Sequence, residues 1–185
     1  MTHGKLSILF RQNFGHWEVD SIIGKRTGKK ESCLVYTERT TRQEIVIKVY
    51  DKTPQCTIKA MQELKRILGK DFTKIFKTLT VDNGVEFTDQ QGFDALGVTV
   101  FYCHPHAPHE RGSNENNNKL LRRHFPKGQS MKDKTQEDAT RAQHFINNYP
   151  REMFLGKCSN DLFKEELEKL KLDDPERVYE FFNLN

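Results

Sequence analysis

The chain has 185 residues, of which 35% are hydrophobic, and its 30 Lys and Arg against 26 Asp and Glu give a formal net charge of +4. This length suits one domain with a sizeable core, and so small an excess of positive charge does not identify a partner by itself. Apolar runs of only a few residues exclude a membrane-spanning helix, and the N-terminus lacks the apolar stretch of a secretory signal, so we expect a cytoplasmic protein with no membrane partner.

The first half of the chain predicts three strands and then a helix. Apolar and β-branched residues mark strands at 16–23, 32–38 and 44–50. The short links between them favour an antiparallel meander. Thr53 and Pro54 are a typical helix start, and apolar residues at helical spacing continue to Gly69, which suits a C-cap. A further helical turn is expected at 71–76.

The second half alternates strands with helices. It predicts strands at 78–81 and 98–102, a loop with Pro and Gly at 105–112, and helices at 88–96, 114–125, 135–149 and 160–170, the last of them closing the fold. This order predicts an α/β domain, with a five-stranded mixed sheet and helices on both faces.

Charges are unevenly distributed along the chain. Residues 119–134 hold six Lys or Arg against one Asp, whereas the segment after Asp161 is rich in Asp and Glu. A basic middle segment is typical of a surface that binds a polyanion.

The strand at 78–81 leads directly into Asp82, Asn83 and Gly84. Asn and Gly tolerate a left-handed backbone, so the strand stops there. Asp82 is then left at the carboxyl end of a central strand, where open α/β sheets place their ligands. Asp-Asn-Gly is also common turn chemistry, so Asp82 alone is equally well explained as a turn former. A functional role needs partners elsewhere in the chain.

Asp20 is one candidate partner. It lies among apolar residues of the first predicted strand, on the same face as Glu18 and Ile22. A carboxylate there suggests a partner, a metal or an opening in the fold, because burying an unpaired charge is costly. A solvated strand face would explain it as well.

Glu115 is the second candidate, near the start of a predicted helix. It falls opposite the apolar stripe of that helix and in register with Lys119 and Arg122. An ordinary surface row of ion pairs would give the same spacing. Together with Asp20 and Asp82, however, it completes a set of oxygen ligands of the kind that Mg²⁺ prefers, and two such ions could activate a nucleophile and stabilise a leaving oxygen.

Three motifs occur in order along the chain: Gly15-His16-Trp17-Glu18-Val19-Asp20, then Thr80-Val81-Asp82-Asn83-Gly84-Val85-Glu86-Phe87, then the stretch from Pro105 to Gly128 that contains Arg111-Gly112-Ser113-Asn114-Glu115. Together they resemble the catalytic core of DDE transposases and retroviral-type integrases. The likeness is greatest to bacterial transposases of the insertion-sequence-thirty family, and it runs from about residue 14 to the end of the chain.

The resemblance implies a ribonuclease-H-like fold, with Asp20, Asp82 and Glu115 as catalytic residues that hold Mg²⁺ or Mn²⁺, two ions being expected. It implies hydrolysis at transposon ends, which frees a 3′-hydroxyl, and then attack of that hydroxyl on target DNA. Lys119 and Arg122 match basic residues that integrases place against DNA. The further expected DNA contacts are Arg111, Asn114 and Arg123.

The resemblance also implies an organisation. We expect residues 1–13 to be a linker from a missing N-terminal DNA-binding region and residues 14–185 to be the catalytic core with its C-terminal helices. The protein would act on DNA of the bacterial nucleoid as a homodimer or larger assembly. Glu86 is expected to orient the loop after Asp82. Two other hypotheses are a catalytically decayed DNA-binding or dimerisation domain that retains the fold, and a ribonuclease-H-like nuclease that cuts RNA–DNA hybrids.

Overall fold

A computed structural model describes residues 13–24, 31–103 and 114–184, without the side chains of residues 114–117. The predicted linker at 1–13, apart from its last residue, and the predicted loop at 105–112 lie outside this part of the chain. Within it, no helix is both long and apolar enough to cross a membrane.

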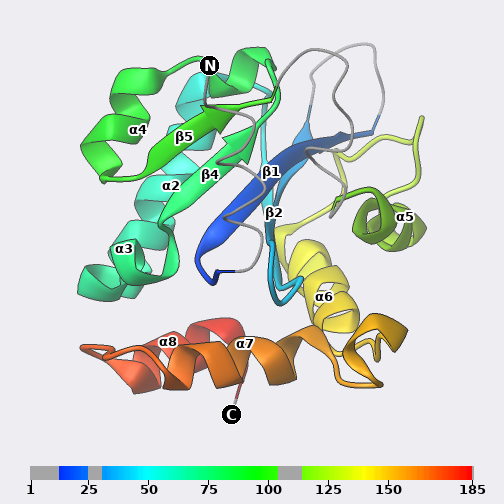
Figure 1. The fold of residues 1–185 in the computed structure, drawn as a ribbon. Coiled ribbons are helices and arrows are strands. Elements are labelled where there is room, and N and C mark those ends of the chain that lie inside the picture. Colours follow the sequence, from blue (N-terminus) through cyan, green and yellow to red (C-terminus); the bar gives the residue numbers. More distant parts are fainter. Residues whose placement is uncertain (1–12, 25–30, 104–113, 185) are drawn as a thin grey trace.

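The fold is built on a five-stranded sheet with the strand order β3-β2-β1-β4-β5 (Figure 1). The antiparallel part consists of β1 (His16–Ile23), β2 (Ser32–Glu38) and β3 (Glu44–Val49). The parallel part adds β4 (Thr78–Val81) beside β1 and β5 (Thr99–Tyr102) beside β4. The mixed sheet and all five predicted strands are confirmed, with ends that differ by one residue at most.

Helices account for most of the remaining described chain. The α-helices are α2 (Pro54–Leu68), α3 (Phe72–Ile75), α4 (Gln90–Leu96), α5 (Asn114–His124), α6 (Gln136–Asn147), α7 (Ser159–Glu168) and α8 (Pro175–Phe182), and the short 3-10 helices are η2 (Gly69–Asp71), η3 (Val85–Phe87) and η5 (Glu152–Phe154). Thr53 caps α2 as predicted, because its side chain accepts a hydrogen bond from the backbone N–H of Cys56.

Helix α8 was not predicted, and the expectation that the helix at 160–170 is the last one was wrong. Asp174 accepts a hydrogen bond from the backbone N–H of Arg177, and Pro175 occupies the first turn. This is the same start signal as Thr53-Pro54. The local sequence therefore contains a signal sufficient to predict α8.

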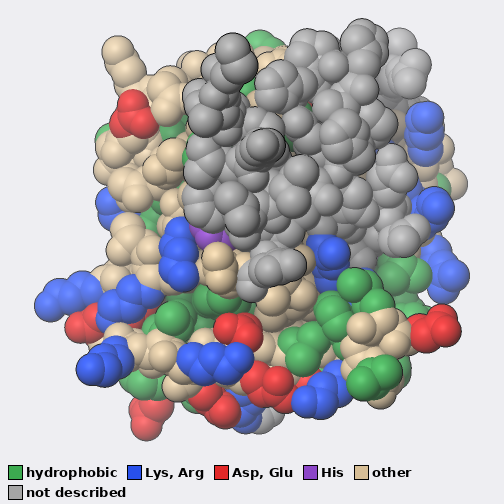
Figure 2. Space-filling view, viewed as in Figure 1, with side chains coloured by type: hydrophobic (Ala, Val, Ile, Leu, Met, Phe, Trp, Pro, Cys, Tyr) green, Lys and Arg blue, Asp and Glu red, His purple; other side chains and the backbone are tan. Residues whose placement is uncertain are grey.

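The sheet separates two hydrophobic cores, which confirms helices on both faces (Figure 1). The larger core packs Trp17 and Val19 against α2, α3, α4, α7 and α8. The smaller core packs Ile22 and Val35 against α5 and α6. Over α7 and α8, acidic side chains are interspersed with Lys and Arg (Figure 2), so the acid-rich tail does not form one acidic surface on the face shown.

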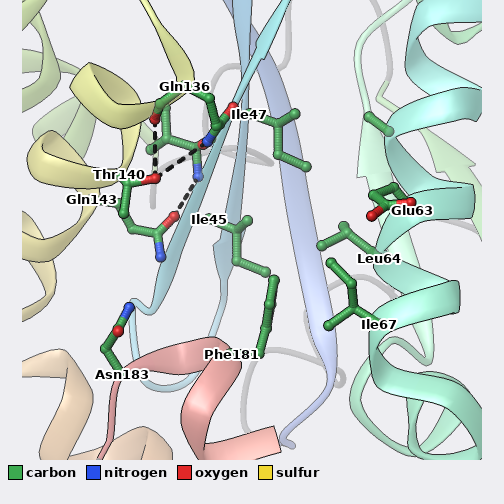
Figure 3. A pocket seen from close by; sticks show the side chains of 12 residues that line it. Ile45, Ile47, Glu63, Leu64, Ile67, Gln136, Thr140, Gln143, Phe181 and Asn183 are labelled. Atoms are coloured by element: carbon green, nitrogen blue, oxygen red, sulfur yellow. Dashed lines mark hydrogen bonds between the residues drawn. The ribbon is translucent and has the colours of Figure 1, made fainter. Parts of the chain in front are cut away.

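Side-chain amides of α6 close the outer edge of β3. They accept hydrogen bonds from alternate strand residues: Glu44 N to Asn147 Oδ1 (2.8 Å), Val46 N to Gln143 Oε1 (3.0 Å) and Lys48 N to Gln136 Oε1 (2.8 Å). Gln136 and Gln143 also border a largely apolar cavity of about 380 Å³ between β3, α2 and α8 (Figure 3). Because these backbone N–H groups are already bonded, β3 is not an open edge for pairing with another strand.

His16, at the start of β1, predicts a pH dependence of stability. The side chain is buried, and its Nδ1 lies 2.7 Å from Thr78 Oγ1. Burial, and then the charges of Lys77 and Arg39, lower the pKa of His16 from 6.5 to about 4. Between these pH values the unfolded chain binds a proton that the folded chain does not. Stability present above pH 6.5 therefore falls as the pH drops, by about 3 kcal/mol at pH 4 and below.

The measurement is urea unfolding of the protein at pH 7 and pH 4.5. His16→Asn is expected to lose less stability than the wild type over this interval, because it lacks the group that titrates. His144→Asn, which changes an exposed histidine of α6, should keep the wild-type difference. An unchanged pH dependence in His16→Asn would contradict the prediction.

Candidate active site

The register between β1 and β4 indicates where Asp20 and Asp82 lie relative to each other. The two strands are parallel, with His16 opposite Thr78 and Glu18 opposite Thr80. The pairing ends at Glu18 and Thr80, and the same register, if extended by two residues, would set Asp20 opposite Asp82, which directly follows β4. In-register residues of neighbouring parallel strands project to the same face of the sheet. We therefore expect two of the three predicted catalytic residues to lie at the same face and the same level of the sheet.

Asp82 both forms a turn and occupies a ligand position. Its Oδ1 accepts a hydrogen bond from the backbone N–H of Gly84 at 2.9 Å. Asn83 Nδ2 donates to the carbonyl oxygen of Cys103, which follows β5, at 3.2 Å. The turn that ends β4 is therefore anchored to the neighbouring strand, and the half-buried Asp82 is held at its start.

Asp20 is one of the residues through which α5 contacts the sheet. Its Oδ1 accepts from the backbone N–H of Ser21 at 2.8 Å, and its Oδ2 accepts from Asn118 Nδ2 at 2.9 Å. One turn further along α5, Arg122 Nη1 donates to the carbonyl oxygen of Ile23 at 2.8 Å. These contacts hold α5 against the second half of β1.

Glu115 lies on α5, one turn before Asn118. Residues 115, 118 and 122 follow one side of a helix, since residues three and four apart are neighbours. The predicted third ligand therefore occupies a position on the side of α5 that contacts β1. The Glu115 side chain itself lies outside the described residues.

The donor set fits a hard divalent cation. Asp20 and Asp82 offer carboxylate oxygens, which suit Mg²⁺ and Mn²⁺, and no sulfur or imidazole ligand is needed. In the side chains that the structure describes, no group of three or more His, Cys, Asp or Glu is arranged to hold a metal. Completion of the predicted triad therefore depends on Glu115.

The predicted DNA contacts divide into three groups. Lys119 and Arg123 are exposed on α5. Arg122 is half-buried, and burial lowers its pKa while the nearby carboxylate of Asp20 acts in the opposite direction. Arg111 and the side chain of Asn114 lie outside the described residues.

A second cavity opens beside the end of β1. Its volume is about 490 Å³, and it is lined by Ser21, Ile23, Gly24, Arg122, Lys127 and Gly128. Ser21 directly follows Asp20, and the Asp20 carboxylate interacts electrostatically with Arg122, so one of the two cationic side chains that line the cavity lies near a candidate ligand.

Sequence reasoning missed two residues of the site. Asn118 could have been found, because it is three residues after Glu115 on the same helix. Lys52 had no signal in the sequence. Its Nζ lies 2.9 Å from Glu86 Oε1, although the two residues are far apart in the chain. Glu86, expected to orient the loop after Asp82, is buried with 1% exposure.

Solved structures with the same fold are integrase cores. The catalytic core domain of BIV integrase superposes with a TM-score of 0.62 at 16% identity, covering 84% of this chain and 97% of that one. A chain of the simian T-cell lymphotropic virus intasome, solved with PP2A regulatory subunit B56 gamma, gives a TM-score of 0.60 at 16% identity and covers 80% and 54%. The fold is the ribonuclease-H-like fold of integrase catalytic cores, as predicted.

No family model matches the chain. Its sequence is 35% identical over 157 residues to a probable transposase of element IS1161 from Streptococcus salivarius, covering 83% of this chain and 43% of that protein. It is 34% identical over 138 residues to the IS1086 transposase of Cupriavidus metallidurans (74% and 39%), and 29% identical over 155 residues to transposase InsI of IS30A from Escherichia coli K12 (83% and 39%).

The chain is therefore homologous to transposases of the IS30 family, which confirms the resemblance carried by the three motifs. It spans less than half the length of the curated relatives it matches.

Proposed function

We propose that this chain is the catalytic core of an insertion-sequence transposase, which cuts DNA at transposon ends and joins those ends to target DNA. The observation that supports the proposal is the parallel pairing of β1 with β4, whose register runs toward Asp20 and Asp82, together with the hydrogen bond from Asn118 of α5 to Asp20. Homology to transposases and the integrase-type fold support the same reaction class.

Asp20, Asp82 and Glu115 would hold one or two Mg²⁺ or Mn²⁺ ions. Such ions, when bound, promote deprotonation of an attacking oxygen and stabilise negative charge on a leaving oxygen. In the first reaction a water oxygen bonds to phosphorus, the P–O3′ bond breaks, and a 3′-hydroxyl is freed. In the second, the oxygen of that hydroxyl bonds to a phosphorus of the target, and the target's own 3′ oxygen leaves.

The cationic groups beside the carboxylates would bind the DNA backbone. Lys119 and Arg123 are exposed on α5, and Arg122 and Lys127 line the cavity next to Asp20. Phosphate contacts of this kind make binding weaken as salt concentration rises. Joining two transposon ends requires at least two copies of the protein, so the active form would be a homodimer or a larger assembly, working on nucleoid DNA in the bacterial cytoplasm.

The test is a cleavage assay with duplex DNA that carries the terminal repeats flanking the gene. Nicking and joining are expected with Mg²⁺ or Mn²⁺ and not with EDTA. Cleavage of RNA–DNA hybrids with the duplex left intact would instead indicate a ribonuclease-H-like nuclease. Salt-sensitive DNA binding without any metal-dependent cleavage would indicate a decayed binding domain.

A further inference from the structure

Glu86 joins three segments that are distant in the sequence. Its Oε1 accepts a hydrogen bond from Ser21 Oγ at 2.7 Å and pairs with Lys52 Nζ at 2.9 Å. Ser21 belongs to β1, Lys52 precedes α2, and Glu86 itself lies in η3. The glutamate is almost fully buried, whereas the Lys52 side chain keeps 22% exposure.

These contacts involve residues adjacent to the candidate metal ligands. Ser21 follows Asp20 in β1, and Gly84 is two residues after Asp82. A Cβ atom added to Gly84 would come within 2.5 Å of Glu86 Oε2 and 2.8 Å of Asp82 Oδ1. The two carboxylate oxygens therefore both lie close to Gly84, and a larger residue at this position would have to displace them.

The second carboxylate oxygen of Glu86 accepts no hydrogen bond from the residues that the structure describes. Oε2 is buried and has no hydrogen-bond partner among the described residues, whereas Oε1 has two. A buried carboxylate oxygen left in this way is rare in folded proteins and calls for an explanation. Its position beside Asp82 Oδ1 adds negative charge to the end of the sheet that carries the candidate ligands.

We infer that Glu86 is a positioning residue for Asp20 and Asp82. It ties the end of β1, through Ser21, to the turn that follows Asp82, and so keeps the two aspartates level. Its charge also strengthens the attraction of this site for a divalent cation, and Lys52 compensates that charge so that the glutamate can be buried. The inference rests on the proposed metal-dependent function.

Manganese binding tests the inference without any reaction. The free Mn²⁺ signal in electron paramagnetic resonance is titrated with the protein for the wild type, Glu86→Gln and Asp82→Asn. Glu86→Gln keeps the size and one acceptor oxygen but removes the charge. It is expected to weaken Mn²⁺ binding about tenfold, the lower end of what residues supporting metal ligands contribute. Asp82→Asn should remove most binding.

Two further variants separate positioning from general stability. Glu38→Gln changes an equally buried glutamate that accepts from Gly15 and Thr41 at the opposite end of β1, and it should leave the Mn²⁺ dissociation constant within about twofold of wild type. Ser21→Ala removes the hydrogen bond to Glu86 without leaving a buried charge unpaired, and should weaken binding about threefold even if Glu86→Gln fails to fold.

The outcomes are distinguishable. If Asp82→Asn has lost Mn²⁺ binding, wild-type Mn²⁺ affinity in Glu86→Gln overturns the inference and leaves the proposed function intact. Where Glu86→Gln is unfolded, wild-type Mn²⁺ affinity in Ser21→Ala has the same meaning. An equal loss in Glu38→Gln also overturns it, because the effect would then be a general response to losing a buried carboxylate. A wild-type protein that binds no Mn²⁺ overturns the metal-dependent function and the inference together.

Discussion

Replacing Asp82 by Asn is expected to slow metal-dependent DNA cleavage by roughly 10³-fold or more, as when a residue that acts as part of a catalytic unit is removed. The amide keeps the shape of the side chain and an oxygen that can accept from the backbone N–H of Gly84. What it lacks is the negative charge that a hard divalent cation requires. The loss should therefore appear in the rate of the chemical step, with the fold intact.

A matched control for this variant is Asp89→Asn. Asp89 Oδ1 accepts from the backbone N–H of Gly92 at 2.9 Å, as Asp82 does from Gly84, but it caps α4. Single-turnover rates in Mg²⁺ and in Mn²⁺ should be unchanged in Asp89→Asn, since Asn is an equally good cap. Undiminished cleavage by Asp82→Asn would remove Asp82 from the site.

Replacing Trp17 by Ala is expected to lower the free energy of unfolding by about 4 kcal/mol. The Trp17 side chain is fully buried and stacks on Phe76, with ring centroids 4.6 Å apart. Its edge meets Phe163 of α7 at 6.0 Å, and its Nε1 donates to the carbonyl oxygen of Ile75 at 2.9 Å. The variant loses this packing and leaves a buried carbonyl without its donor. The expected loss in the free energy of unfolding is a large share of the roughly 5–15 kcal/mol that stabilises a domain.

Urea unfolding measures this loss, and two variants bracket it. Trp17→Phe keeps an aromatic ring but not the hydrogen bond, so its loss should be smaller, about 1–2 kcal/mol. Tyr50→Ala removes an aromatic ring that is 83% exposed just after β3, and should change stability by less than about 0.5 kcal/mol. A loss below about 1 kcal/mol in Trp17→Ala would show that the larger core does not depend on this ring.

Local patterns in the sequence determined the elements of the sheet and the identity of two candidate ligands. The strands at 16–23 and 78–81 were predicted at their observed bounds, because alternation and β-branched residues are properties of neighbouring positions. Asn83 and Gly84 likewise marked the end of β4 and left Asp82 beyond it. Helix α8 carries an equally local start signal in Asp174 and Pro175.

Only the tertiary structure decided how these pieces meet. The register that leads toward Asp20 and Asp82 depends on the pairing of β1 with β4, and these strands are separated in the sequence by β2, β3 and the long helix α2. The contact of Lys52 with Glu86 and the contact of Asn118 with Asp20 arise from the packing of α2, η3 and α5 at one end of the sheet. The periodicity of apolar residues in the sequence cannot predict such contacts, because they join segments whose spacing along the chain is unrelated to their distance in the fold.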